Sequence, residues 1–332
     1  EWVAFIDDDA VPEPTWLRYL LAPRSTPSVA AMGGLVRARD GIRFETQASV
    51  LDGLGRATPV RVDAGQATVL TPPKGQAVKT EGTNMAVRRD VLVTLGGFDP
   101  AYKFHMSEVD LDMRLARAGF ATALVPAAQV HHAQAPSARR RTDGVTLDMT
   151  EQGASWAVFQ RKFIPEDQWP KHWAAQRGQE RLEALRLMVK GQIEPGMVNR
   201  RLRSLDAGYE QGRARPLSTG RLASHAAVAF RAVMPVFGPS TVVRSNETAR
   251  SDAIRTAVAR VKDGQIVTLI DQVILSTKSR VTFEPDGYWS HKIGWLDVSK
   301  GWRVFAKTLT RKARAQAEIL RIHKERGISE QE

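Results

Sequence analysis

The order of apolar and polar positions along the chain predicts alternating strands and helices over residues 1–135. Residues 2–6 and 29–36 are short, continuous apolar runs, which are typical of strands buried on both faces of a sheet. A further run at residues 121–125 predicts another strand. Residues 40–80 are rich in Gly, Thr and Pro, and we expect loops with short strands there. This alternation is typical of the α/β class.

Glycine and serine positions predict further boundaries in the same region. Gly33–Gly34 lies inside the second predicted strand and indicates a close approach of another backbone. The helix before Gly96–Gly97 should end at these glycines. Ser107 is an expected N-cap, and Asp110 follows three positions later as in a capping box, so a helix is predicted over residues 108–118.

The second half of the chain has a different character. Residues 136–215 predict a helical extension that ends in a linker, and residues 216–332 predict a small α+β region of unknown role. Residues 286–295 fit either a hairpin turn packed on the core, which we favour, or an aromatic platform for carbohydrate. The elements expected in the last region are a helix over 249–262, a hairpin-like pair of strands over 265–274 and 279–283, and a terminal helix over 303–326.

Composition limits the functions that are open to this chain. It has 332 residues and no cysteine, which excludes disulfides, a thiolate nucleophile and cysteine-ligated zinc. No stretch approaches the roughly 20 apolar residues of a membrane span. The net charge of +12 comes entirely from the rest of the chain after residue 130: residues 1–130 contain 14 Lys/Arg and 15 Asp/Glu, a net of −1, and the rest contains 34 and 21, a net of +13. Such a basic half is typical of proteins that contact nucleic acid, an anionic membrane surface or an anionic glycan, and equally of helices with a solvated basic face.

Three carboxylates follow the first apolar run directly. Asp7, Asp8 and Asp9 should lie at the C-terminal edge of the sheet, where open α/β sheets bind ligands. Carboxylates held together repel one another, and a hard divalent cation with oxygen ligands is the usual compensation. The alternative is a solvated acidic turn that caps the next helix.

Three separated motifs occur in a fixed order. They are Asp7–Asp9 with the following Val-Pro-x-Pro-x-Trp-Leu, then Gly82–Arg89 followed by Leu95–Asp99, and finally Ser107–Phe120. The ordered set resembles the family 2 glycosyltransferases with the GT-A fold, over roughly residues 1–135. The resemblance implies an incomplete GT-A mixed sheet flanked by helices, because the upstream half that grips the nucleotide in this family is missing from the sequence.

The resemblance also implies roles for the acidic cluster. Asp9 would be a ligand of Mn²⁺ or Mg²⁺, Asp7 would contact the donor's ribose or the metal shell, and Asp8 would be the variable middle residue. In related enzymes a histidine after the last strand often contacts the metal or the diphosphate. His131 and His132 are therefore candidates, with His132 favoured by its spacing, against the alternative of exposed loop histidines.

A catalytic base is implied at the start of a helix. The family places an acidic pair there, and this chain has Ser107–Glu108, so Glu108 is the candidate base and the first acid is replaced. Asp110 is the nearby alternative, although its position suits capping. Asn84 and Arg88 are implied to line the acceptor or donor pocket.

The predicted function is metal-dependent, inverting transfer of a sugar from a nucleotide-diphospho-sugar to a hydroxyl of a saccharide or lipid-linked acceptor, in polysaccharide or glycoconjugate synthesis. The sequence has no Gln-x-x-Arg-Trp motif, which indicates a single, non-processive addition. We expect a cytoplasmic protein whose basic half lies at the inner face of the membrane, and no nucleic-acid partner, because no recognition motif for one is present. We also expect the chain to bind UDP- or GDP-sugar poorly by itself. The alternative function is an inactive GT-A-like module that binds an anionic ligand or a partner.

Overall fold

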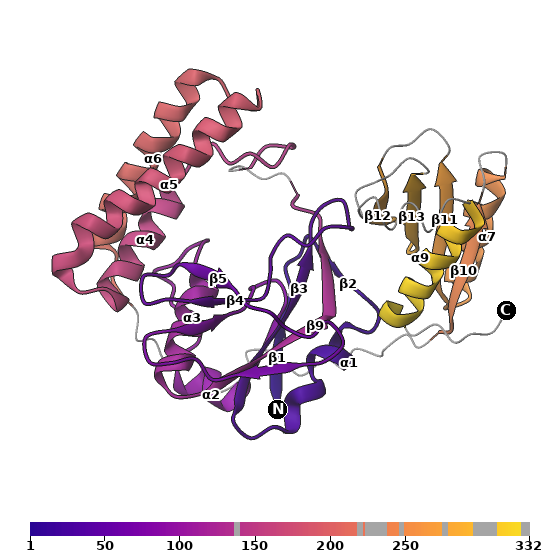
Figure 1. Ribbon diagram of the computed structural model, residues 1–332, viewed down its shortest axis with the longest axis horizontal. Coiled ribbons are helices and arrows are strands. Elements are labelled where there is room, and N and C mark those ends of the chain that lie inside the picture. Colours follow the sequence, from indigo (N-terminus) through magenta and orange to yellow (C-terminus); the bar gives the residue numbers. More distant parts are fainter. Residues whose placement is uncertain are drawn as a thin grey trace.

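A computed structural model describes residues 1–135, 140–217, 222, 238–245, 249–273, 278–294 and 311–326. Along the chain, a mixed α/β domain is followed by a group of long helices and then by a small α+β unit (Figure 1). The predicted fold class is confirmed. The division at residues 135 and 215 stays a prediction. The linker is expected over residues 213–220, of which 218–220 lie outside the described residues.

The central sheet has the strand order β1-β8-β3-β9-β2, with β6 paired to the first part of β9. Among the hydrogen-bonded pairs of this sheet, β3 with β9 is parallel and the others are antiparallel. The strand β3 is buried as predicted, whereas β1 lies at an edge of the sheet and is partly exposed, so the prediction that residues 2–6 are buried on both faces is wrong. The strands are β1 (Trp2–Phe5), β2 (Ala10–Pro12), β3 (Val29–Arg37), β6 (Thr68–Leu70), β8 (Met85–Arg88) and β9 (Ala121–His132).

Short elements complete the domain. As expected, residues 40–80 form loops and short strands, three of which make a separate sheet of order β5-β4-β7. The helix α2 ends just before Gly96–Gly97, where both glycines have positive φ, as predicted. The elements are α1 (Trp16–Leu20), η1 (Ala22–Ser25), β4 (Ser49–Leu51), β5 (Ala57–Pro59), β7 (Ala77–Lys79), α2 (Arg89–Thr94) and α3 (Ser107–Arg117).

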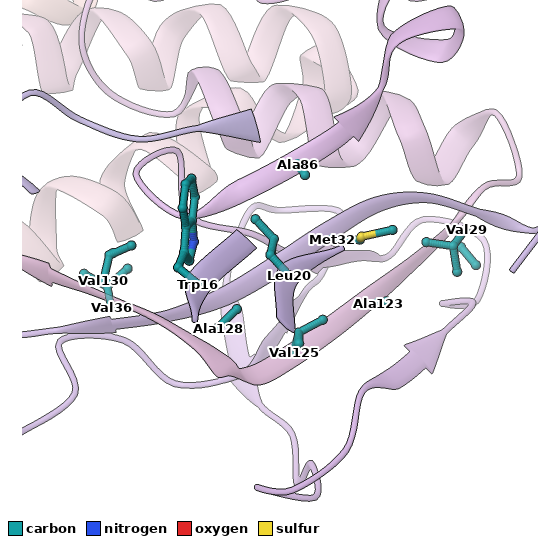
Figure 2. Packing of buried hydrophobic residues seen from close by; sticks show 11 residues of the cluster. Trp16, Leu20, Val29, Met32, Val36, Ala86, Ala123, Val125, Ala128 and Val130 are labelled. Carbon is teal, nitrogen blue, oxygen red and sulfur yellow. The ribbon is translucent and has the colours of Figure 1, made fainter. Parts of the chain in front are cut away.

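Alternation along β8 divides the core between the two faces of the sheet. Ala86 faces α1, whose Trp16 and Leu20 pack against the sheet (Figure 2). Met85, the preceding residue, packs on the opposite side with Leu111 of α3. The central sheet is therefore covered by helices on both faces.

Gly34 makes the close backbone contact that the sequence predicts. A Cβ atom at this position would lie 2.1 Å from the carbonyl oxygen of Ala128 and 2.4 Å from the amide nitrogen of Asn84. No side chain fits at that distance. The glycine therefore allows β3, β8 and the bend in β9 to meet.

The start of α3 differs from the prediction. Ser107 is the first helical residue, and the N-cap is Met106, which has a positive φ of 66° and makes no side-chain capping bond. Asp110 does not complete a capping box either. It is fully buried, accepts a hydrogen bond from Arg114 at 2.7 Å and is paired with Lys162. Two cations compensate the buried carboxylate, and a capping rule that considers only neighbouring residues does not include them.

The helical group continues the core of the sheet domain. Phe159 of α4 packs in the same hydrophobic cluster as Met113 of α3. The helices α4 and α6 touch backbone to backbone, since a Cβ at Gly208 would lie 1.9 Å from the carbonyl oxygen of Thr150. The elements are α4 (Thr150–Phe163), η2 (Glu166–Gln168), α5 (Trp169–Val189) and α6 (Pro195–Ala214).

The C-terminal unit has a four-stranded sheet of order β10-β11-β13-β12. The predicted hairpin between residues 265–274 and 279–283 is wrong, because β13 lies between these strands and β12 pairs with β13 instead. The turn that joins β12 to β13 is the hairpin turn we favoured, and Trp289 after it is buried, so it forms no open aromatic platform. Trp295 and residues 303–310 lie outside the described residues. The elements are β10 (Ser240–Ser245), α7 (Arg250–Lys262), β11 (Ile266–Val273), β12 (Arg280–Phe283), β13 (Trp289–Gly294) and α9 (Arg311–Arg326).

Candidate functional site

The acidic cluster lies in the turn between β1 and β2. The backbone N–H of Ala10 donates to the carbonyl of Asp7 at 3.1 Å, and the N–H of Asp7 donates to Thr83 Oγ1 at 3.2 Å. Because β1 and β2 are the two ends of the strand order, the turn crosses the edge of the sheet at which β3 and β9 end. Residues 7–9 therefore occupy the edge where ligands bind in open α/β sheets.

Three side chains converge at this edge. Asp7, Asp9 and His132 each offer one ligand atom, and these atoms lie within 4.8 Å of one another. Asp9 Oδ1 is 3.2 Å from His132 Nε2. Two carboxylates and an imidazole fit Mn²⁺ or Mg²⁺, since these ions accept oxygen ligands and Mn²⁺ also accepts imidazole nitrogen. Asp8 is exposed and does not belong to this group.

A carboxylate on the far side of the ring orients His132. The Nδ1 atom of His132 is 3.1 Å from Glu45 Oε2, and Gln134 donates to Glu45 Oε1 at 2.6 Å. The hydrogen bond to Glu45 raises the pKa of His132, against the opposing effect of burial. Carboxylates commonly fix metal-binding histidines in this way, leaving the second nitrogen for the ion. Sequence reasoning missed Glu45, because nothing in its local pattern marks it.

The other oxygen of Asp9 is held by the segment after β9. Asp9 Oδ2 accepts hydrogen bonds from the N–H of Ala135 at 2.8 Å and from Arg140 Nη2 at 3.3 Å. The guanidinium of Arg140 thus places a positive charge beside the carboxylates. The sequence offered only a basic run at this point and gave no reason to single out Arg140.

His131 faces away from the cluster. Successive residues of a strand point to opposite faces, so His131 and His132 cannot serve one ion together. His131 Nε2 is 2.7 Å from Glu13 Oε1, and its ring lies 4.6 Å from that of Trp289. The prediction that His131 is a metal ligand is corrected accordingly. The alternative of exposed loop histidines is also wrong, because both residues belong to β9.

Glu108 lies next to the turn that carries Thr83. A Cβ on Gly82 would be 3.9 Å from the Cβ of Glu108, so Glu108 and Asp7 flank the same short segment. Burial raises the pKa of the Glu108 carboxyl, and its own N–H and Lys79 oppose the shift. Glu108 is thus a partly buried acid with no cation within salt-bridge distance among the described residues.

Asp110 is placed differently. Both of its oxygens are taken up by Arg114 and Lys162, and its side chain is completely buried. A carboxylate with two cationic partners in the core holds α3 to the rest of the domain. This geometry assigns Asp110 to the fold, so we do not keep it as an alternative base.

Two further candidates also belong to the fold. Asn84 donates to the carbonyls of Leu35 and Ala128 at 2.9 and 3.0 Å and accepts from Trp16 at 2.8 Å. Both of its N–H groups are used and its side chain is fully buried, so a ligand cannot reach it. Arg88 of β8 lies opposite Trp2 in the strand register, which is the end of β1 away from the acidic turn. The implied pocket roles of both residues are corrected.

Comparison with known proteins follows the same part of the chain. Residues 1–151 match the family model described as "Glycosyltransferase like family 2". Two curated proteins of Mycobacterium tuberculosis, from strains CDC 1551 / Oshkosh and ATCC 25618 / H37Rv, are 30% identical to this chain over 159 residues. Each is named N-acetylglucosaminyl-diphospho-decaprenol L-rhamnosyltransferase. The alignment covers 42% of this chain and 49% of each relative. The chain thus spans about half the length of the curated relatives it matches.

Proposed function

We propose that this chain, whose residues 1–151 match glycosyltransferase family 2, transfers a sugar from a nucleotide-diphospho-sugar to an acceptor hydroxyl. The observation that carries the proposal is the convergence of Asp7, Asp9 and His132 at the ligand-binding edge of the sheet, with Glu108 at the start of α3, beside the turn that carries Thr83. A donor site and a base side by side are what the reaction requires. Four residues in this arrangement come from three separate segments of the chain.

The donor diphosphate is the leaving group. Asp7, Asp9 and His132 would hold Mn²⁺ or Mg²⁺, which when bound stabilises negative charge on that leaving group as a Lewis acid. Glu45 fixes the orientation of His132, and Arg140 adds a positive charge next to Asp9. Glu45 keeps His132 ordered, and Arg140 limits the repulsion between the carboxylates.

Glu108 takes the proton from the acceptor hydroxyl in this proposal. Its raised pKa makes the carboxylate a better proton acceptor than an exposed glutamate. One base that acts while the hydroxyl attacks the face opposite the leaving group gives inversion at the sugar carbon. We expect a single addition in each encounter, as the motif pattern predicts.

The acceptor is proposed to be a lipid-linked saccharide. The printed name of the two relatives specifies an acceptor of this kind, a sugar joined through diphosphate to decaprenol. No helix in the described part of the chain is long and apolar enough to cross a bilayer. We propose that the basic second half brings the site to an anionic membrane surface at the cytoplasmic face. Sedimentation with vesicles tests this: binding to phosphatidylglycerol vesicles and not to phosphatidylcholine vesicles is expected.

A transfer assay on the full-length protein tests the reaction itself. Purified protein is incubated with Mn²⁺, a panel of nucleotide-diphospho-sugars that includes activated rhamnose, and a lipid-linked N-acetylglucosamine acceptor. We expect Asp9→Ala to reduce turnover at least as strongly as the loss of a general base, roughly 10²- to 10⁴-fold. Asp8→Ala is the matched control, because Asp8 is adjacent but outside the ligand group, and should keep wild-type turnover.

The alternative function gives a different result. An inactive binding module would show no transfer with any donor, and Asp9→Ala would change nothing. Wild-type turnover in Asp9→Ala would likewise contradict the proposal.

A further inference from the structure

We propose that a polar cavity between α4, α5 and α6 binds the acceptor saccharide through its hydroxyl groups. This inference rests on the transferase function above and deepens it. The cavity has a volume of about 350 Å³ and is bounded by the three helices, by residues 143–146 and by His105. That volume is within the range of sites for small ligands.

Arg201 on α6 is the first observation that points to a ligand. The residue lines the cavity, yet it is only 5% exposed, and neither Nε nor Nη1 has a hydrogen-bond partner among the described residues. Unpaired buried N–H groups cost free energy and are rare in native proteins. A ligand in the cavity would supply the acceptors that the protein does not.

Carboxylates on α5 determine what kind of ligand fits. Glu180 and Glu183 line the same cavity as Arg201, and burial raises the pKa of Glu180. Gln152 reaches Glu180 only at 3.5 Å, and no cation among the described residues lies within salt-bridge distance of it. An anion at this position would be repelled by two acids. A sugar hydroxyl, in contrast, can donate to Glu180 and accept from Arg201 at the same time.

The packing of the helices explains why the cavity exists. Gly208 brings α6 against the backbone of α4 at Thr150, which is the first residue of that helix. One turn earlier on α6, Ser204 still bonds to the N–H of Met149 at 3.0 Å. Arg201 lies three residues before Ser204 on α6, where the facing segment is the loop before α4 and no longer the helix. The cavity is therefore a consequence of where α4 begins.

One wall of the cavity is connected along the chain to the proposed base. His105 lines the cavity, and Glu108 is three residues further on, at the start of α3. Met106 between them has φ 66°, an uncommon conformation for a residue with a side chain. This sharp connection joins the cavity wall directly to the start of the helix that carries Glu108.

Direct binding to the full-length protein tests the inference. Saturation-transfer difference NMR and calorimetry are run with methyl β-N-acetylglucosaminide, methyl α-rhamnoside and methyl β-galactoside, and with inorganic pyrophosphate as an anionic probe. The variants are Arg201→Met and Glu180→Gln. Arg203→Met is the matched control, because Arg203 is exposed on the same helix two residues away. We expect the first two variants to weaken saccharide binding about ten- to hundredfold, as for the loss of hydrogen bonds to charged groups, and the control to bind as wild type.

The possible outcomes separate this inference from the transferase function. No donor is present in the binding experiment, so a saccharide affinity that falls only in the two cavity variants supports the site even if no transfer is detected. In the transfer assay the same variants should raise the KM for acceptor and leave the KM for donor unchanged. Equal saccharide affinity in all proteins, no binding of any methyl glycoside, or pyrophosphate binding that Arg201→Met weakens would overturn the proposal. If Arg201→Met does not fold, Glu180→Gln at its partly exposed position decides the question.

Discussion

Glu13 and Arg326 form a buried ion pair between residues 313 positions apart in the sequence. Arg326 Nε donates to Glu13 Oε2 at 2.7 Å, and both side chains are 1% exposed. The guanidinium also lies 4.3 Å from the ring of Trp289, which in turn contacts His131. The C-terminal unit is therefore joined to the strand that carries His132, on the face opposite the acidic cluster. Figure 1 shows α9 running down toward β2 at this junction.

Breaking this pair should destabilise the protein strongly. Burial alone would raise the pKa of Glu13, but the charge of Arg326 outweighs it and holds that pKa well below its usual range. Glu13→Gln or Arg326→Met leaves a buried charge without its partner, and we expect each to lower the free energy of unfolding by about 3–5 kcal/mol. The double variant should cost less than the sum of the two. Denaturant unfolding measures all three proteins.

An exposed pair in the same unit provides the control. Arg255 and Asp252 on α7 are both about 70% exposed, and Arg255→Met should change stability by less than about 1 kcal/mol. If Glu13→Gln is no more destabilising than this control, the pair does not hold the two units together.

Acidification should weaken the C-terminal unit. His291 on β13 is almost fully buried, and burial, with the nearby charge of Arg326, lowers its pKa to about 3, although Glu318 opposes the shift. Arg321 also faces it. The unfolded state therefore binds a proton near pH 6.5 that the folded state does not bind until near pH 3. Stability from this group is complete above pH 6.5 and is lost as the pH falls through that window, by an amount on the order of a few kcal/mol.

Thermal melts between pH 7 and pH 4 provide the measurement. The melting temperature of the wild type should fall through this range, and His291→Leu should show a smaller fall because it has no group to protonate. Parallel curves for the two proteins would contradict the assignment.

Metal affinity should depend on the orientation of His132 as well as on its presence. Glu45→Ala removes the carboxylate bonded to His132 Nδ1 and should weaken Mn²⁺ binding about 10- to 100-fold, as loss of such a partner does in other metal sites. His132→Ala should weaken it at least as much. Calorimetry or Mn²⁺ electron paramagnetic resonance gives the affinities, and Asp8→Ala is the unchanged reference. Wild-type affinity in His132→Ala would remove the histidine from the site.

Local sequence motifs pointed to some residues of the candidate site and missed others. Asp7 and Asp9 could be found because they follow an apolar strand directly, so the strand and the candidate ligands lie in one short segment of the sequence. Glu45 and Arg140 could not, because they reach the cluster only through the tertiary fold and their own neighbourhoods carry no pattern.

The errors in the fold have the same origin. Local rules placed Ser107 as an N-cap and Asp110 in a capping box, but Asp110 pairs with Arg114, one turn further along α3, and with Lys162, which is distant in the sequence. The predicted pairing of β11 with β12 was wrong for a related reason. These strands are neighbours in the sequence and were expected to pair, but β13 lies between them in the sheet. Apolar periodicity predicts that an element exists more reliably than which element it contacts.

Glu108 and Asp110 should separate into an activity residue and a stability residue. Glu108→Gln keeps the size of the side chain and removes a carboxylate whose pKa burial already raises, so the free energy of unfolding should change little, while kcat falls roughly 10²- to 10⁴-fold. Asp110→Asn weakens two buried ion pairs and should cost several kcal/mol of stability.

The pH–rate profile of the wild type adds an independent readout. Because Glu108 must be deprotonated to accept the hydroxyl proton, kcat should fall on the acid side at a pH above the ordinary glutamate pKa of about 4.5. Denaturant unfolding and turnover are measured on the same preparations, so that a loss of activity can be compared with a loss of folded protein. Full activity in Glu108→Gln would exclude it as the base. A stable but inactive Asp110→Asn would return that role to Asp110, because a purely structural carboxylate cannot give that result.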